Sequence, residues 1–257
     1  VAIGADGLLV LCNSTKADFR MRLFNADGSE ADTCGNGSRC TARFAYLKGI
    51  ALRKMRFETR AGIYTAEITD LDTVKLNLSD PGQMKLNLNL NTSVGELPVH
   101  FIDTGVPHVV VFVSEIENAV RSPKSDPPKA DRSITLTNLD VCGLGKELRE
   151  HPVFQPAGTN VNFIEVVDRH TIRIRTYERG VENETLACGT GSIGSSIIAY
   201  RLGYLTPPVS VHTQGGSILK IYFEPTPDAI SKVILEGDAR FIYEGILYEE
   251  AVMYNGQ

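Results

Sequence analysis

The feature that most constrains this chain is an internal repeat. The segment CGNGSRCTARFAYLKG, which starts at Cys34, aligns without a gap with CGTGSIGSSIIAYRLG, which starts at Cys188, so the offset is 188 − 34 = 154 residues. The same offset pairs Glu30 with Glu184, and a slip of one residue brings FRMRLFN over IRIRTYE. Matches that recur in several blocks at a shared offset indicate a duplication rather than chance. We therefore expect two homologous halves, each with one cysteine motif.

Hydrophobic patterning predicts mostly strands. Alternating or continuous β-branched runs indicate strands at LLVL, RMRLF, TVKLNL, HVVVFV, NFIEVV, TIRIRTY, ILKIYF and KVILEG. Each cysteine motif opens a helical segment, from Gly35 to about Leu47 and from Gly189 to about Leu202, and a glycine follows each. KELREH predicts a short amphipathic helix, and the Pro-, Ser- and charge-rich segment 121–140 predicts a surface excursion. Each half should therefore place many strands around one main helix.

The repeat also predicts how the halves divide the chain. We expect the boundary in the Asn-rich, loop-like stretch 79–92, with a first half of residues 1–85 plus a C-terminal strand at about 240–257, and a second half of residues 86–239. The segment DTGVPHVVVF around His108 should have a counterpart one repeat earlier, which falls before Val1. Roughly 50 residues of the first half are therefore expected to precede this sequence.

Composition excludes several classes of protein. The 257 residues are 42% hydrophobic and 22% charged with a net charge of −5, which is globular and gives no electrostatic case for binding nucleic acid or an anionic membrane. No apolar run approaches the roughly 18 residues that span a bilayer. Five widely spread cysteines do not indicate a disulfide framework, and they favour the reducing cytoplasm. Because Cys34 and Cys40 are too far apart for the usual zinc spacing, we expect no structural metal.

A cysteine at the entry of a helix suits proton transfer at carbon. The unpaired N–H groups and the positive end of the helix dipole favour a thiolate and can also bind a carboxylate. Two such entries that face each other would make Cys34 and Cys188 an opposed acid and base, one removing an α-proton and the other returning one from the opposite side. The two thiols would titrate as a coupled pair. Cys12, Cys40 and Cys142 have no such partners, and we expect them to be core or surface thiols.

Longer motifs surround both cysteines. The chain has FNADGSEADTCGNGSRC from Phe24 to Cys40 and YERGVENETLACGTGS from Tyr177 to Ser192, and IGADGLL and GTNVNF lie further upstream of each. These motifs resemble the signatures of the diaminopimelate epimerase family, pyridoxal-phosphate-independent amino-acid racemases and epimerases. The resemblance implies an α/β (α+β) fold of two pseudo-symmetric homologous domains, each a highly curved, mostly antiparallel sheet or barrel around a main helix.

The resemblance also implies an activity and a site. It implies interconversion of LL- and meso-2,6-diaminopimelate by a two-base thiolate/thiol mechanism in lysine and peptidoglycan precursor biosynthesis, with Cys34 and Cys188 as base and acid. It implies substrate contacts at Asn25, Gly35, Asn36, Asn160, Glu178, Arg179, Gly189 and Thr190. It further implies that His108 and Glu178 adjust the pKa values of the two cysteines. A small amino-acid substrate, a cytoplasmic location and a homodimer complete these expectations.

Other interpretations stay open at this point. Val106 stands where many family members have asparagine, and the family's N-terminal Gly-Asn-Asp-Phe motif is missing from this sequence. A related two-cysteine racemase for proline or hydroxyproline would keep the fold and both thiols, and a thiol redox or binding protein is a third interpretation. Asn25 could simply start a turn, and we leave Glu30 and Glu184 out of the site as strand-end charges.

Overall fold

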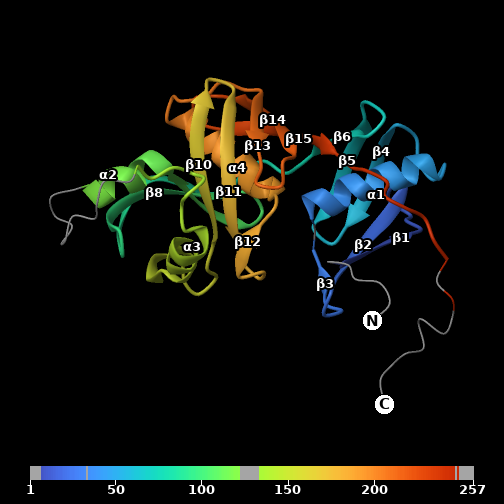
Figure 1. Ribbon diagram of the computed structural model, residues 1–257. Coiled ribbons are helices and arrows are strands. Elements are labelled where there is room, and N and C mark those ends of the chain that lie inside the picture. The colour runs from blue at the N-terminus through green and yellow to red at the C-terminus, as the bar shows by residue number, and fades with distance from the viewer. Residues whose placement is uncertain (1–6, 33, 122–132, 247, 249–257) are drawn as a thin grey trace, which may run out of the picture. The chain divides into compact units, whose positions relative to one another are not determined.

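The protein has a sheet-rich α+β fold with few helices, as the sequence predicts. The computed structural model describes residues 7–32, 34–121, 133–246 and 248 (Figure 1). The chain divides into two compact units: unit 1 comprises residues 1–74 and 238–257, and unit 2 comprises residues 75–237. The predicted boundary between residues 85 and 86 lies about one strand later. The strand predicted at about 240–257 is absent from the described residues of that range, 240–246 and 248, because the last strand ends at Asp238.

Unit 1 is a small sheet with one helix. Its elements are β1 (Gly7–Cys12), β2 (Phe19–Asn25), β3 (Glu30–Ala31), α1 (Gly35–Leu47), β4 (Lys54–Thr59), β5 (Gly62–Ile68) and the start of β6 (Thr73–Asn77). β2 pairs antiparallel with β1 and β3 and parallel with β4, which pairs antiparallel with β5. α1 packs against these strands (Figure 1).

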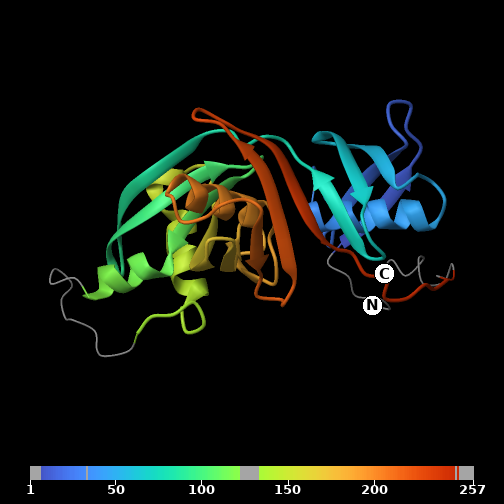
Figure 2. The same cartoon turned by 90° about the horizontal axis from the view of Figure 1, so that it is seen from above.

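Unit 2 repeats this order and adds a preceding layer. The added elements are β7 (Met84–Thr92), β8 (Gly95–Asp103), β9 (Pro107–Phe112), α2 (Val113–Arg121), α3 (Val141–Glu150) and the short 3₁₀ helix Pro152–Phe154. The repeated elements are β10 (Asn160–Asp168), β11 (Thr171–Glu178), β12 (Asn183–Thr185), α4 (Gly189–Arg201), β13 (Val209–His212), β14 (Ile218–Pro225) and most of β15 (Ile230–Asp238). Figure 2 shows β14 and β15 as long neighbouring strands, paired antiparallel.

The repeat is visible in the strand pairing. β11 pairs antiparallel with β10 and β12 and parallel with β13, which pairs antiparallel with β14. These directions match those of β1 to β5 one for one. The sequence alignment therefore corresponds to a repeated unit of five strands and one helix.

The core of unit 2 has two layers because its central strands are buried on both faces. Val110 on β9 faces Ile193 and Ile197 of α4, whereas its neighbours Val109 and Val111 face the cluster that includes α2 and α3. Such strands are expected to carry continuous apolar runs, and HVVVFV is one. In unit 1 the rings of Phe19 and Phe57 stack with centroids 5.2 Å apart, and both are fully buried.

The predictions of the two main helices are confirmed to within a residue. α1 ends at Leu47 and α4 at Arg201, and Gly49 and Gly203 follow with φ of 68° and 82°. A left-handed residue just after the last turn is the usual helix stop, and glycine adopts it without strain. The short helix predicted at KELREH is also present, but α3 begins five residues before that segment, at Val141, after the N-cap Asp140.

The loop prediction for residues 79–92 is wrong, because most of that stretch is β7. Met84, Leu86, Leu88 and Leu90 alternate with polar residues and pack against the unit 2 core. Period-two burial outweighs the low strand propensity of asparagine. Asn87 has φ of 56° where the pairing with β8 shifts register, a position that asparagine tolerates.

The predicted surface excursion at residues 121–140 falls partly outside the described residues, which omit 122–132. In the described part Leu136 is buried, so residues 133–140 contribute to the core rather than only to the surface. Gly4 and Asp6, which the repeat pairs with Gly158 and Asn160, also lie outside the described residues.

Candidate functional site

Each unit presents a cysteine as the N-cap of its main helix. Cys34 has φ −151° and ψ 123°, and its Sγ accepts the Gly37 N–H at 3.5 Å. Cys188 has φ −126° and ψ 113°, and its Sγ accepts the Gly191 N–H at 3.4 Å. A cap side chain normally accepts one of the first free helical N–H groups, a role usually filled by an oxygen. In both units a sulfur fills it, so the thiols have matching local geometry.

Glycine is required beside Cys188 because the chain is crowded there. A Cβ on Gly191 would overlap Oδ1 of Asn162, and it would lie 3.2 Å from the Cys188 Sγ. The Thr190 hydroxyl lies 3.5 Å from the same sulfur, and the Thr190 carbonyl accepts a hydrogen bond from the Thr104 hydroxyl at 3.4 Å. Gly189 is buried against Leu235. The first turn of α4 is therefore closely supported by its neighbours.

Behind that turn lies a buried polar network that sequence reasoning missed. The amide nitrogen of Asn162 donates to Nδ1 of His108 and to the Val109 carbonyl, each at 3.1 Å, and its oxygen accepts from the Thr176 hydroxyl at 3.0 Å. Asn162 and His108 are 0% exposed. The signal was present in GTNVNF, where Asn160 and Asn162 lie two residues apart and therefore on one face of β10.

The network determines the state of His108. Because the amide donates to Nδ1, the ring proton is on Nε2, which has no hydrogen-bond partner among the described residues. Burial lowers the pKa of His108 to about 3, and the nearby charge of Arg179 acts in the same direction. His108 is therefore neutral near pH 7 and can act there only as a hydrogen-bonding group, not as a cation.

Three of the predicted substrate contacts lie together at the end of β11. The Oδ1 of Asn160 accepts the Arg179 N–H at 2.9 Å, while its amide nitrogen donates to the Pro107 carbonyl at 3.0 Å. The Arg179 guanidinium donates to the Ala157 carbonyl at 2.8 Å. Glu178 accepts a hydrogen bond from the Thr185 hydroxyl at 2.9 Å. Burial raises the pKa of Glu178, and the Thr185 hydrogen bond opposes that rise.

In unit 1 an arginine organises the helix entry. Arg39 is 5% exposed and donates to Oδ1 of Asn36 at 2.9 Å and to the carbonyls of Gly35 and Asp238. Burial lowers the pKa of Arg39, partly offset by the negative charge that Cys40, Asp238 and Cys34 can carry. The position that corresponds to Arg39 in unit 2 is Ile193, so this cation belongs to one unit alone.

Asn25 lies at an exposed turn between β2 and β3. Its amide nitrogen donates to the Ser29 hydroxyl at 3.0 Å, and its carbonyl accepts the N–H of Gly28, which has φ of 85°. The structural role that we considered for Asn25 is therefore present. Val106, the departure from the family pattern, accepts the Thr104 N–H in the turn before His108.

The remaining cysteines are free. Cys12 is half-buried on β1, Cys40 is exposed on α1, and Cys142 is exposed and donates to Asn183 Oδ1 at 3.1 Å. Within the ranges that the structure describes, no group of three or more His, Cys, Asp or Glu side chains is arranged to hold a metal ion. None of the described helices is long and apolar enough to cross a membrane.

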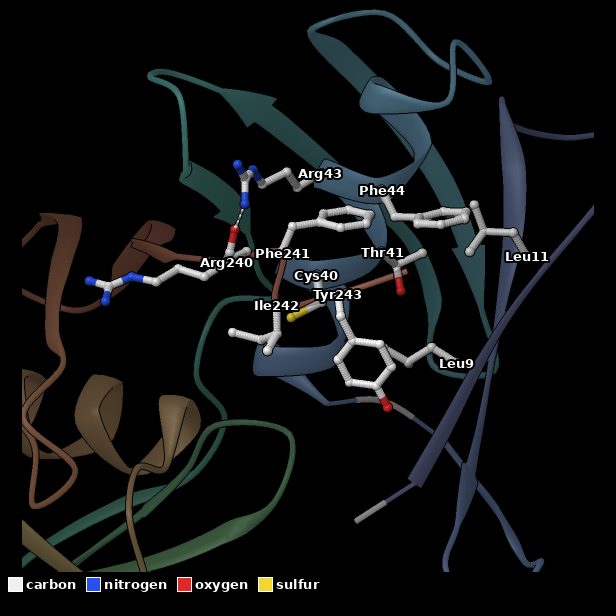
Figure 3. Close-up of a pocket in the computed structure, with 11 residues that line it drawn as sticks. Leu9, Leu11, Cys40, Thr41, Arg43, Phe44, Arg240, Phe241, Ile242 and Tyr243 are labelled. Atoms are coloured by element: carbon white, nitrogen blue, oxygen red, sulfur yellow. Dashed lines mark hydrogen bonds between the residues drawn. The ribbon is translucent and has the colours of Figure 1, made fainter. Parts of the chain in front are cut away.

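A pocket of about 270 Å³ in unit 1 holds none of the predicted site residues (Figure 3). It lies beside α1 and is lined mainly by apolar side chains, among them Leu9, Leu11, Phe44, Phe241 and Tyr243. Phe241 stacks on Phe44 with centroids 6.1 Å apart. The Arg43 guanidinium donates to the Ala239 carbonyl at the edge of this pocket.

Over most of its length, this chain is similar in sequence to known proteins of one family. The model of the family described as diaminopimelate epimerase matches residues 1–84 and 100–242. Diaminopimelate epimerase from Hydrogenobaculum sp. (strain Y04AAS1) is 44% identical over 252 residues, covering 97% of this chain and 83% of that protein. The enzyme of the same name from Aquifex aeolicus is 41% identical over 256 residues, covering 98% and 83%.

Solved structures extend the comparison to the fold alone. A hydroxyproline epimerase from Agrobacterium vitis, with bound trans-4-OH-L-proline, aligns with a TM-score of 0.67 at 19% identity, covering 94% of this chain and 75% of that one. A probable proline racemase from Agrobacterium radiobacter K84 aligns with a TM-score of 0.64 at 18% identity, covering 90% and 72%.

Proposed function

This chain belongs to the diaminopimelate epimerase family, and on that premise we propose that it interconverts LL- and meso-2,6-diaminopimelate without a cofactor. It is an isomerase of lysine and peptidoglycan precursor biosynthesis. The observation that carries the proposal is the pair of sulfur N-caps at Cys34 and Cys188, on helices that the repeat relates. A redox or binding protein would have no need for two thiols in matching cap geometry.

The reaction follows from two thiols in opposite protonation states. The thiolate of one cysteine takes the α-proton, so the C–H bond breaks and its electron pair stays on the α-carbon, delocalised into the α-carboxylate. The thiol of the other cysteine then delivers its proton to the opposite face of that carbon, which forms the new C–H bond and inverts the centre. The second cysteine ends as the thiolate, so the pair is set for the reverse direction.

The helix entries are the proposed site of the α-carboxylate. The N–H groups of Gly35, Asn36, Gly189 and Thr190 lie in the first turns of α1 and α4, where free N–H groups and the helix dipole favour an anion.

The far end of the substrate is proposed to meet the polar residues at the end of β11 and at the β2–β3 turn. Arg179 can pair with a carboxylate and Glu178 with an ammonium group, while the amides of Asn25 and Asn160 can donate and accept. The hydrogen bond from the Arg179 N–H to Asn160 places two of these groups next to each other. This arrangement favours a substrate whose far end is itself an amino acid.

His108 and Glu178 are proposed to modulate the cysteines by different means. His108 is neutral and buried, so its influence is through hydrogen bonding and position. Glu178, whose pKa is raised by burial, can change its charge closer to neutral pH than an exposed carboxylate.

Incubation with LL-2,6-diaminopimelate in deuterium oxide tests the function. We expect meso product and deuterium at one α-carbon, measured by NMR and mass spectrometry. Neither product nor deuterium would reject the proposal. Proline and hydroxyproline serve as the competing substrates, because the solved structures of that class share the fold at under 20% identity. Turnover of proline with no turnover of diaminopimelate would favour that alternative.

A cytoplasmic location and a homodimer belong to the same proposal. Five cysteines spread widely along the chain suit a reducing compartment. The homodimer is supported by Phe241, Ile242 and Tyr243, which are 44%, 83% and 71% exposed beside the pocket in Figure 3. Exposed apolar patches of this kind are typical of interfaces. Sedimentation velocity should give a mass near twice 28.1 kDa.

A further inference from the structure

Two arginine–glutamate pairs occupy equivalent places in the two units. In unit 1, Arg22 on β2 donates through Nε and Nη2 to the two oxygens of Glu30 on β3, at 2.9 and 3.0 Å. In unit 2, Arg175 on β11 donates through the same two nitrogens to Glu184 on β12, each at 2.7 Å. The repeat pairs these residues in sequence, and the structure pairs them in the same two-point geometry.

Both pairs fasten the segment that leads into a cysteine. Glu30 and Glu184 each lie four residues before the cysteine of their own unit, since 34 − 30 and 188 − 184 both equal four. The strands that carry them are very short: β3 has two residues and β12 has three. So short a strand has few ladder hydrogen bonds, and its register is weakly specified by the backbone alone.

A two-point arginine–carboxylate contact, here called a fork, can define the register that the short strand leaves weakly specified. Two parallel N–H···O bonds to one carboxylate define both distance and orientation, which a single-point contact does not. The two glutamates are 19% exposed in their side chains, whereas Arg22 is 40% and Arg175 13% exposed. Partly exposed ion pairs contribute little to global stability, so the presence of the same pair in both units indicates a local role.

The unit 2 pair also connects with the polar network at α4. Thr176, the residue after Arg175, donates to Asn162 behind Gly191. Arg175 further donates through Nη1 to the carbonyls of Leu136 and Leu139. A shift of β12 against β11 would therefore disturb both the segment that leads into Cys188 and the hydrogen-bonded network behind the first turn of α4.

We propose that Arg22–Glu30 and Arg175–Glu184 are duplicated positioning pairs, each of which holds the register of the short strand before its cysteine and thereby the placement of that thiol at the helix entry. They are positioning residues that touch neither substrate nor the reacting atoms. The consequence for turnover rests on the proposed function, but the consequence for each thiol does not.

Each unit is the matched control for the other. Glu30→Gln and Glu184→Gln keep the side-chain shape and remove the charge and one point of the fork. The rate of iodoacetamide alkylation is measured at each cysteine by peptide mass spectrometry, in the whole chain at one pH. Loosening the strand by fractions of an ångström exposes the thiol and misaligns it, and misplacement near 1 Å can cost about 10²-fold in rate.

The expected result is a change confined to one unit. Glu30→Gln should raise the alkylation rate of Cys34 by about threefold or more and leave that of Cys188 within about twofold of wild type, and Glu184→Gln should do the reverse. In either variant kcat should fall about tenfold, while KM stays within about twofold of the wild-type value. The exchanged pair Arg22→Glu with Glu30→Arg should recover most of the loss. Recovery would not follow if the glutamates acted as acids or bases.

Three results would overturn the proposal. The first is that the alkylation rates of both cysteines change together in one variant, which would indicate a global effect on stability. The second is that neither alkylation rate changes. The third is that the exchanged pair folds but does not recover the lost kcat. If either Gln variant does not fold, Arg22→Lys and Arg175→Lys decide, because they keep the charge and lose the fork. If the wild-type chain fails to epimerise diaminopimelate, the proposed function falls while the alkylation pattern still decides the role of the pairs.

Discussion

The two units share a thiol geometry but surround it differently. In unit 1 a Cβ on Gly37 would lie 3.0 Å from Cδ2 of Leu9, whereas in unit 2 a Cβ on Gly191 would overlap the amide of Asn162. Leu9 pairs with Leu23 across β1 and β2, and Asn162 pairs with Thr176 across β10 and β11, so these are equivalent positions. We call the side chains behind the first helical turn the wall of each thiol. The wall behind Cys34 is the apolar Leu9, and the wall behind Cys188 is the buried hydrogen-bonded network of Asn162.

The comparison separates the features that the two units share from those that differ between them. The cysteine caps, the adjacent glycines and the arginine–glutamate pairs are the same in both units, and they set the position of the thiol. The surrounding wall differs because unit 2 has β9, α2 and α3 packed against its central strands, which buries both faces. Matched positioning and divergent packing are therefore compatible.

The largest expected effect tests whether both thiols are needed. Cys34→Ala and Cys188→Ala should each lower kcat for LL-to-meso conversion by at least about 10³-fold, since each removes an acid or a base. The measurement is steady-state turnover, and Cys142→Ala, an exposed thiol outside both motifs, is the control that should keep wild-type activity. Full turnover in either alanine variant would show that the units are not chemically equivalent.

The second effect tests the difference between the walls. Asn162→Leu, which installs the residue type of unit 1, leaves His108 Nδ1 and the Thr176 hydroxyl without their partner. Each orphaned group costs about 1–3 kcal/mol, so the free energy of unfolding should fall by at least about 2 kcal/mol.

Leu9→Asn is the matched variant in unit 1. Position 9 is half-buried rather than buried, so an amide there can stay hydrated and should cost less. Urea unfolding measures both variants. Equal losses would mean that the two walls do not differ in the way the structure indicates.

Acid should weaken unit 2 before unit 1. All five histidines lie between residues 100 and 212. Burial lowers the pKa of His108 to about 3 and of His100 to about 4, from 6.5. Between those values and 6.5 the unfolded state binds more protons than the folded state, so stability is present above pH 6.5 and is lost as the pH falls. The slope approaches about 1.4 kcal/mol per pH unit for each histidine.

His108→Gln and His100→Gln should each reduce that slope in urea unfolding between pH 7 and 5. The measure is the difference from wild type, because the raised pKa of Glu178 acts in the opposite direction. Hydrogen exchange at pH 5 should lose protection first within residues 75–237. An unchanged slope in the double variant would contradict the assignment.

The smallest effect concerns the second helical turn. Cys40 and Gly194 are equivalent by the repeat, but Cys40 is exposed, whereas a Cβ on Gly194 would lie 2.8 Å from Cγ2 of Ile102. Gly194→Ala should cost about 1–3 kcal/mol through overpacking. Cys40→Ala should stay within about 0.5 kcal/mol in the same urea assay. Similar costs at both positions would remove this distinction.

Much of the fold follows from local pattern. The two helices begin directly after Cys34 and Cys188 and end shortly before a glycine, and these start and stop signals act over only a few positions. The low strand propensity of asparagine predicts a loop at residues 79–92, but the alternating leucines place most of that stretch in β7. The spacing in GTNVNF places Asn162 on the same face of β10 as Asn160, but its partners could not be predicted, since they come from β9 and β11, more than ten residues away along the chain.

The sequence by itself determined that this chain is a duplicated unit, which motif recurs, and which family it resembles, because identity at a shared offset needs no knowledge of packing. Only the tertiary structure decided that Glu30 and Glu184 form forks, that His108 is neutral with its proton on Nε2, and that Asn25 closes a turn. Those states depend on burial and on hydrogen bonds between strands distant in sequence. A linear pattern records the residues involved but not the desolvation and geometry that determine their charge and position.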